Sequence, residues 1–236
     1  MTTFDLATPS RVLAIGAHPD DIEFGCGATL AKWARAGAHV ELAVLTDGSK
    51  GTWDPQSDLA ALVATRQVEQ RAAAGVLGAD DVHFLGAVDG ELDADAPMRE
   101  RVCTLLRAVQ PDVVLGHDPW KQYRLHPDHH HAGQLVIDGI VAARDPHFFP
   151  AAGSPHRPDH LLLFEAQVVD HVEIVGDADV TSKVDALLCH HSQWRSTMGI
   201  DEAGALGDAQ RDAFTAKMRD EVVDAGGEAF KHLTDL

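Results

Sequence analysis

The sequence predicts an α/β protein with a mostly parallel, Rossmann-like sheet sandwiched between helices. Short apolar runs of strand length alternate along the chain with longer helical segments. The run 11–17 is almost continuously apolar, as in a strand covered on both faces, and strand, helix and strand follow in the order of a right-handed crossover. Because 236 residues suit one hydrophobic core, we expect a single domain over residues 1–236.

The first half of the chain carries the clearer pattern. After the first strand, Pro19 can open a helix, and the carboxylates that follow it suit a helix N-terminus. Gly37 and Gly78 end the first two helices. The expected strands are 11–17, 40–46, 82–85 and 112–116, and the expected helices are 22–36, 57–77 and 97–109.

The pattern weakens beyond His126. We interpret the Pro-rich stretch 145–158 as a surface loop and not as a domain linker, because apolar strand material resumes directly after it. The remaining expected elements are a helix over 132–143, strands over 161–169 and 172–175, and helices over 182–191 and 208–223.

Composition excludes several classes of protein. The chain has 37 acidic against 19 basic residues, and a net charge of −18 repels polyphosphates and anionic lipids, so we expect no nucleic-acid or membrane partner. No apolar run approaches the roughly 18 residues that span a bilayer, and the first residues do not resemble a secretion signal, so we expect a cytoplasmic protein. Three widely spaced cysteines predict neither a disulfide framework nor a thiolate zinc site.

Histidine is unusually abundant, and its first cluster comes directly after the first strand. In open parallel sheets, ligands bind at the carboxyl ends of the strands. In His18-Pro-Asp-Asp21, the outer two residues could bind one metal ion while Asp20 stays free to hold a water. Taken alone, this motif is more typical of a solvated, proline-led helix start than of a metal site.

A second cluster, His126-Pro-Asp-His-His-His131, also follows a strand and opens a helix. His126 could share a metal with His129, three residues on, or with His130, four residues on. Three consecutive histidines cannot all point the same way, so we expect one or two of them at the surface. The two clusters together predict a metal site.

At this point the sequence resembles a known family, the LmbE-like or PIG-L zinc-dependent N-acetylglucosaminyl deacetylases, which include enzymes of the mycothiol and bacillithiol pathways. The resemblance spans about residues 11 to 195, and its two histidine motifs carry it. The matching segments are Ala17-His-Pro-Asp-Asp-Ile-Glu-Phe-Gly-Cys-Gly27, Leu45-Thr-Asp-Gly48, Thr65-Arg66 with Glu69, Phe84-Leu-Gly86 with Asp89, His126-Pro-Asp-His129, and Ala186 to Gln193.

The resemblance implies a zinc site in an LmbE-like fold. It implies His18, Asp21 and His129 as the zinc ligands, with a water in the open fourth place and Asp20 as the catalytic base. It also implies a homo-oligomer. Fe²⁺ and Co²⁺ are the alternative metals.

Further roles follow for residues near these motifs. A protonated His126, held charged by Asp128, would stabilise the oxyanion of the reaction, and either it or Asp20 would return the proton to the leaving amine. Arg66 and Asp89 lie where the family contacts its sugar, although each also has a plain structural interpretation.

We therefore expect a hydrolase that removes the N-acetyl group from an N-acetylglucosamine-type sugar or glycoside, a small-molecule substrate. A same-mechanism amidase on a non-sugar N-acyl compound is an alternative. A non-catalytic metal or sugar-binding module is another, although it would have no use for Asp20. A dinucleotide-binding protein is disfavoured, because Leu30 replaces the third glycine of G-x-G-x-x-G and the carboxylates after the first strand would repel a pyrophosphate.

Overall fold

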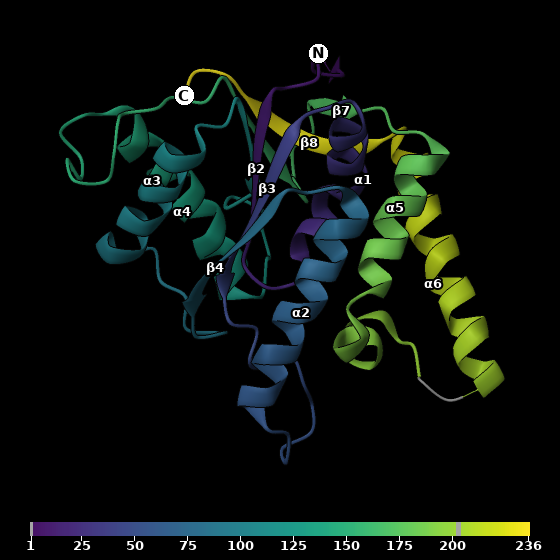
Figure 1. Ribbon diagram of the computed structural model, residues 1–236. Coiled ribbons are helices and arrows are strands. Elements are labelled where there is room, and N and C mark those ends of the chain that lie inside the picture. The colour runs from purple at the N-terminus through teal and green to yellow at the C-terminus, as the bar shows by residue number, and fades with distance from the viewer. Residues whose placement is uncertain (1, 202–203) are drawn as a thin grey trace.

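The computed structural model describes residues 2–201 and 204–236 and shows a central sheet between two layers of helices (Figure 1). This architecture confirms the predicted α/β fold. The strands are β1 (Thr3–Phe4), β2 (Arg11–Gly16), β3 (His39–Thr46), β4 (Asp81–Ala87), β5 (Val113–His117), β6 (His160–Phe164), β7 (His171–Glu173) and β8 (Glu228–Leu233).

The strands form one sheet in the order β1-β7-β8-β6-β5-β2-β3-β4. From β6 to β4 all neighbours are parallel, so their carboxyl ends share one edge of the sheet. β8 runs antiparallel to both β6 and β7. The mostly parallel arrangement is as predicted, whereas the antiparallel insertion of β8 is not.

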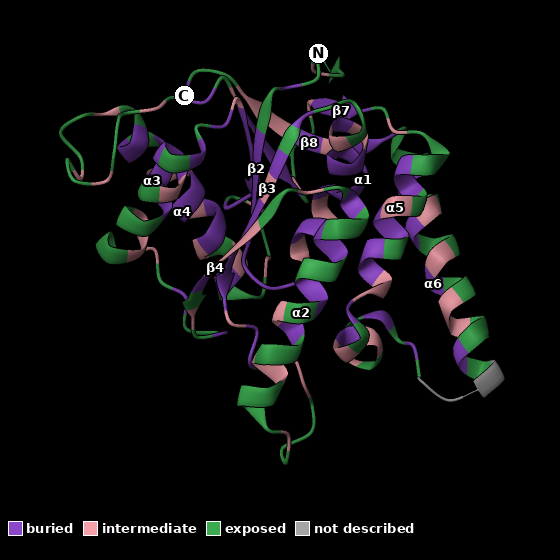
Figure 2. Cartoon of the chain, in the orientation of Figure 1, coloured by how far each residue is buried: buried purple, intermediate pink, exposed green. Residues whose placement is uncertain are grey.

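Helices cover both faces of the sheet (Figure 1). One face packs against α3 (Ala96–Val109) and α4 (Pro127–Arg144). The other packs against α1 (Asp21–Arg35), α2 (Leu59–Leu77) and α5 (Asp177–Leu188). A smaller core joins α5 to α6 (Gly204–Ala225), which lies outermost. Figure 2 shows exposed residues along the outer sides of α2 and α6 and buried residues where helices meet the sheet.

Several boundaries in the second half differ from the expected ones. α4 begins at Pro127 and not at residue 132, because a proline in the first turn needs no N–H partner and its fixed φ suits the helix. α5 covers 177–188 instead of 182–191, and 191–198 forms a 3₁₀ turn (His191–Gln193) followed by a π turn (Trp194–Met198). Within the described residues, no helix is both long and apolar enough to cross a lipid bilayer.

Helix α1 is broken at Cys26, whose φ of −153° and ψ of 18° are not helical. The glycines on either side allow the close packing of this region. A Cβ atom on Gly25 would collide with the ring of Phe164 on β6. The glycines that resemble a dinucleotide motif therefore let α1 approach the sheet and its neighbouring helix.

The backbone freed by this break is bound by a buried carboxylate. Glu228, on β8, accepts hydrogen bonds from the N–H groups of Ala28 and Thr29 at 3.1 and 2.7 Å. Lys183 of α5 donates to the same carboxylate at 2.6 Å, and both side chains are almost fully buried. One ion pair thus connects α1, α5 and β8.

We expect Glu228→Ala to lower the free energy of unfolding by about 3–5 kcal/mol, because it leaves Lys183 buried without a counter-charge. Urea denaturation of the purified protein measures this change. The matched control is Glu221→Ala, which removes an exposed ion pair to Lys217 (3.8 Å) and should change stability by less than about 1 kcal/mol. Similar losses in both variants would contradict the prediction.

Candidate metal and catalytic site

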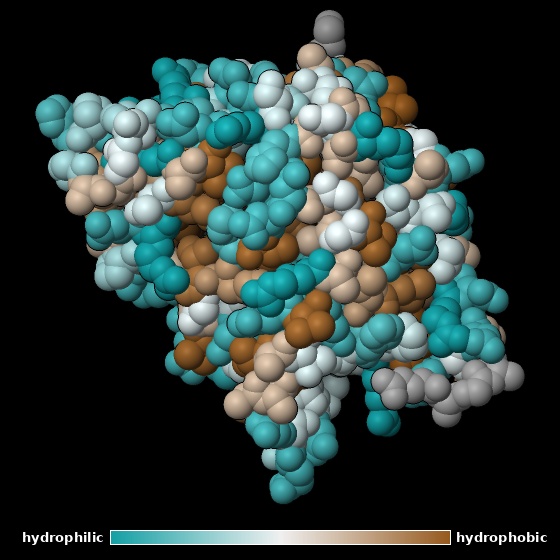
Figure 3. All heavy atoms as spheres, in the orientation of Figure 1, coloured by the Kyte–Doolittle hydropathy of each residue, from teal (hydrophilic) through white to brown (hydrophobic). Residues whose placement is uncertain are grey.

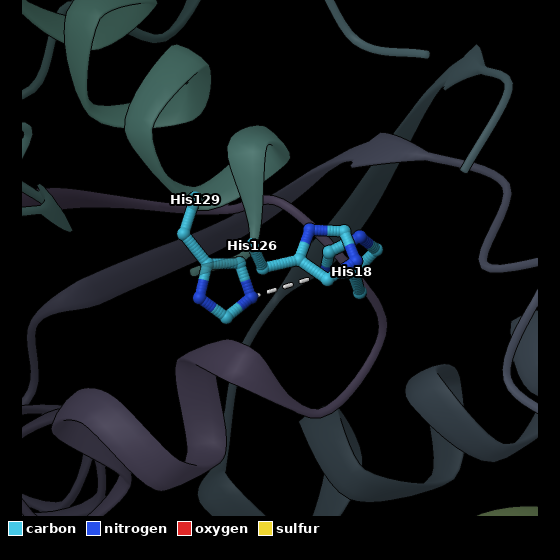
Figure 4. A group of neighbouring side chains, drawn as sticks. All are labelled: His18, His126 and His129. Carbon is cyan, nitrogen blue, oxygen red and sulfur yellow. Dashed lines mark hydrogen bonds between the residues drawn. The ribbon is translucent and has the colours of Figure 1, made fainter. Parts of the chain in front are cut away.

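The two histidine-bearing turns meet at the carboxyl edge of the sheet. His18 follows β2. His126 directly precedes α4, and His129 lies in the first turn of that helix. β5, the strand before α4, is paired with β2. Their imidazole rings converge in Figure 4, with ring centroids 4.6 Å apart for His18 and His126 and 5.2 Å apart for His126 and His129. Nitrogen atoms of all three histidines lie within 4.8 Å of one another.

Donor groups of His18, Asp21 and His129 lie at the corners of a triangle, the donor triangle, in which each histidine faces a different Asp21 oxygen. The Nδ1 atom of His18 lies 3.2 Å from Nε2 of His129 and 3.3 Å from Oδ2 of Asp21, and Oδ1 of Asp21 lies 3.3 Å from Nε2 of His129. Tetrahedral metal bonds of about 2.0–2.1 Å place neighbouring ligand atoms about 3.3 Å apart. Each of these pairwise separations suits a first-row cation such as zinc, and the donors are the nitrogen and oxygen ligands that such cations accept.

His117, the last residue of β5, lies behind this triangle. Its Nε2 atom is 3.3 Å from Oδ2 of Asp21, and its ring stacks on His129 at a centroid distance of 4.4 Å. On its other side Nδ1 lies 3.2 Å from a carboxylate oxygen of Glu165. The sequence places His117 at the end of a strand, which suits either a position beside the metal ligands or one in the core.

The second nitrogen of His18 faces two carboxylates. Its Nε2 atom lies 3.1 Å from Asp128 and 3.2 Å from Asp89. Burial alone would lower the pKa of His18, but its hydrogen bonds to Asp128, Asp21 and Asp89 outweigh burial and raise that pKa to about 12. Such carboxylates also fix the orientation of an imidazole whose other nitrogen binds a metal.

The structure corrects the expectation that Asp128 holds His126 in its charged form. The Asp128 carboxylate instead accepts hydrogen bonds from His18, at 3.1 Å, and from the N–H of Gly90, at 2.6 Å. Burial, and then the positive charges of His18 and His129, lower the pKa of His126. These surroundings disfavour a charged His126, because burial and the nearby imidazoles outweigh the attraction of Asp128.

Asp20 stays outside the donor groups found among the described residues. Its φ of 99° is in the left-handed region, and its N–H donates to the Gln70 side chain at 3.0 Å. The nearest cation is Arg66, with Nη2 3.6 Å from Oδ2 of Asp20. Burial is the largest influence and raises the pKa of Asp20 to about 6, against the opposing effect of Arg66. A carboxyl group of that pKa can exchange a proton near neutral pH.

Behind Asp20 lies a buried network of polar side chains, which the sequence did not predict. The Gln70 amide donates to Glu23 at 2.5 Å, and Nε2 of His190 lies 3.7 Å from the other Glu23 oxygen. Burial opposes the charge on His190, but the nearby Glu23 carboxylate raises the net pKa of this histidine. His190 is thus fully buried behind Asp20, whereas the neighbouring His191 is exposed.

Arg66 and Asp89 both lie at this edge of the sheet. Arg66 is buried and donates to the carbonyls of Pro19 and Gly48, at 2.6 and 2.8 Å, so it fixes the loops that follow β2 and β3. Asp89 accepts from the N–H of Lys50 at 2.9 Å and is nearly buried. A contact between either side chain and a substrate stays a prediction.

The other histidines of the second cluster point to different partners. Nδ1 of His130 is 2.7 Å from the carbonyl of Pro119, and Nδ1 of His131 is bonded to the carbonyl of Leu92. Of the three consecutive histidines, His129 is therefore the one that faces the candidate metal site. The sequence left open which of them would.

These observations define the class of this protein. It is an α/β protein whose sheet carries, at its carboxyl edge, a His/Asp cluster able to bind a metal. Residues 13–140, more than half of the chain, match the PIG-L family, described as GlcNAc-PI de-N-acetylase. The chain is 33% identical to the diacetylchitobiose deacetylase of Thermococcus kodakarensis over 78% of its own length and 70% of that protein's. The chain belongs to the PIG-L family and is a deacetylase, a hydrolase of linear amide bonds.

Two further comparisons agree. The chain is 30% identical to the uncharacterized deacetylase YaiS of Escherichia coli, over 77% of this chain and 90% of that one. The solved structure of N,N'-diacetylchitobiose deacetylase from Pyrococcus horikoshii superposes with a TM-score of 0.83 at 26% identity, covering 96% of this chain and 84% of that one. The LmbE-like fold is therefore confirmed.

We expect His129→Ala to weaken zinc binding by more than about 100-fold, because it removes one corner of the donor triangle. Elemental analysis after dialysis, followed by competition with a chelating dye, measures the change. His130→Ala is the matched control and should keep its zinc. If His130→Ala loses zinc and His129→Ala does not, the ligand is His130.

Proposed function

We propose that this deacetylase is zinc-dependent and removes the acetyl group from an N-acetylglucosamine-type sugar or glycoside, with Fe²⁺ or Co²⁺ as alternative metals. One observation carries the proposal. His18, Asp21 and His129 approach one another pairwise to 3.2–3.3 Å, through both oxygens of Asp21, and a separate buried carboxylate, Asp20, directly precedes Asp21. This combination suits hydrolysis better than metal storage, because storage would need no second, uncoordinated carboxylate.

In this proposal His18, Asp21 and His129 hold the cation, and His117 supports Asp21 from behind. A bound divalent cation supplies a Lewis acid that polarises a carbonyl group and makes water more acidic. Asp128 and Asp89 accept the remaining N–H of His18 and so fix its ring.

Asp20 acts as the general base. Its carboxylate takes a proton from the attacking water as the water oxygen bonds to the amide carbon. The C–N bond then breaks, the amine leaves with the proton that Asp20 returns, either directly or through His126, and acetate is the second product. Arg66, 3.6 Å from Asp20, keeps part of the Asp20 population ionised at neutral pH and is a positioning residue.

His126 stabilises the developing oxyanion. As a neutral imidazole it still offers one ring N–H, and a single donor aimed at the transition state can stabilise it strongly. Asp89 and Arg66 remain our candidates for contact with the sugar. Asp89 lies in the loop after β4, and both side chains are hydrogen-bonded to the loop after β3.

Two relatives, from Thermococcus kodakarensis and Pyrococcus horikoshii, are named for an acetylated disaccharide. We therefore place acetylated sugars ahead of non-sugar amides as substrates. The test is release of acetate and primary amine in equal amounts from N-acetylglucosamine and its glycosides, compared with N-acetyl amino acids. Faster turnover of the amino acids would favour the amidase alternative, and no release from any of them would reject the proposal.

Asp20→Asn should retain zinc and lose about 10²- to 10⁴-fold in kcat, because an amide cannot take the proton from water. Acetate release gives the rate, and elemental analysis of the same preparation gives the metal content. Near-normal turnover in this variant would remove Asp20 as the base.

His126→Ala should lower kcat about 10²- to 10³-fold, the usual effect of removing one oxyanion donor. The variant should keep its zinc, since His126 is not one of the three ligands that we propose. His130→Ala serves again as the control, with a rate close to that of the unmodified enzyme. An unchanged rate in His126→Ala would exclude this histidine from the mechanism.

A further inference from the structure

We propose that the cleft between residues 50–57 and 191–198 binds a second sugar ring of the substrate, with Trp53 as its stacking platform. The inference rests on the deacetylase function proposed above. It narrows the substrate from N-acetylglucosamine compounds in general to glycosides of at least two rings.

Trp53 is the observation that suggests a ligand. Its side chain is 87% exposed, although indole is among the largest apolar groups in proteins. It lines two adjoining hollows of about 490 and 340 Å³, within the range of about 300–1,000 Å³ that small-molecule sites occupy. Figure 1 shows this loop projecting beyond the first turn of α2, and Figure 3 shows that the same protruding end is largely hydrophilic around it.

The opposite wall of the larger hollow comes from the 3₁₀ and π turns, through Ser192, Arg195 and Ser196. Single π turns occur often at functional sites. This wall is held firmly: the N–H and Oγ of Ser192 donate to Glu69 of α2 at 2.8 and 2.6 Å. A cleft fixed in this way loses little entropy when a ligand binds.

The two walls of the cleft are also hydrogen-bonded to each other, and they lie close to Arg66 and Asp20. The Gln193 amide donates to the carbonyl of Gly51 at 3.1 Å, and Gly51 packs so closely on Arg66 that a side chain there would collide with the guanidinium. Arg66 in turn lies 3.6 Å from Asp20. Since Trp53 is two residues beyond Gly51, at most about 7 Å of chain separates them, and we infer that one substrate spans both places.

The chemistry of the cleft favours a carbohydrate. An aromatic face lies among the hydroxyls of Thr52 and Ser196, the carboxylate of Asp54 and the guanidinium of Arg195. A pyranose ring has one face of C–H groups that packs on an aromatic ring, and a rim of hydroxyls that both donate and accept hydrogen bonds. The net charge of −18 disfavours a nucleotide, and the polar rim disfavours an acyl chain.

The test compares Trp53→Ala and Trp53→Phe on N-acetylglucosamine and on N,N'-diacetylchitobiose. Trp53→Ala should raise KM for the disaccharide about tenfold, while KM for the monosaccharide and both kcat values change less than about twofold. Trp53→Phe should restore most of the disaccharide KM because it keeps an aromatic face. Trp120→Ala is the control, since Trp120 is another exposed tryptophan, at a different hollow. Equal changes for both sugars, or none for either, would overturn the proposal.

A binding measurement separates this inference from the catalytic one. Calorimetry with chitobiose, the deacetylated disaccharide, needs no turnover. About tenfold weaker binding to Trp53→Ala than to Trp120→Ala supports the cleft even if no acetylated sugar is hydrolysed, an outcome that would reject only the proposed function. Equal binding to both variants rejects the cleft even if deacetylation is observed.

Discussion

Buried carboxylates and cations that neutralise one another stabilise the carboxyl edge of the sheet. Asp20, Asp21, Asp89 and Asp128 all converge at the carboxyl ends of the strands, where most of their surface is shielded from water. Carboxylates so placed repel one another unless cations stand among them. His18 lies within 3.3 Å of three of them, and a buried guanidinium serves the fourth. A divalent cation bound in the donor triangle would add charge of the sign that this cluster attracts.

The parallel half of the fold was predictable because each strand there is a short apolar run followed by a turn. β2, β3 and β5 are buried on both faces, so their sequences carry the signal directly. β8 escaped prediction because its partners, β6 and β7, lie far away in sequence and its own pattern mixes buried and half-exposed residues. Such a strand is defined by its neighbours more than by its composition.

The site was predictable at the level of turns and less so at the level of atoms. That His18 and the start of α4 come together follows from the rule that ligands gather at the carboxyl ends of parallel strands. Which carboxylate faces which imidazole depends on tertiary packing: Asp128 binds His18 although His126 is closer in sequence. The network of Gln70, Glu23 and His190 was missed for the same reason, since three separate helices and turns meet there.

The backbone of Asp20 is held in the left-handed region. A residue with a side chain at φ 99° holds about 1–3 kcal/mol of conformational strain, which the surrounding hydrogen bonds maintain. Glycine would relax the turn, yet glycine has no carboxylate with which to accept a proton. In the proposed mechanism, heat resistance and turnover therefore compete at this one position, and selection for thermal tolerance alone would favour a more stable but inactive protein.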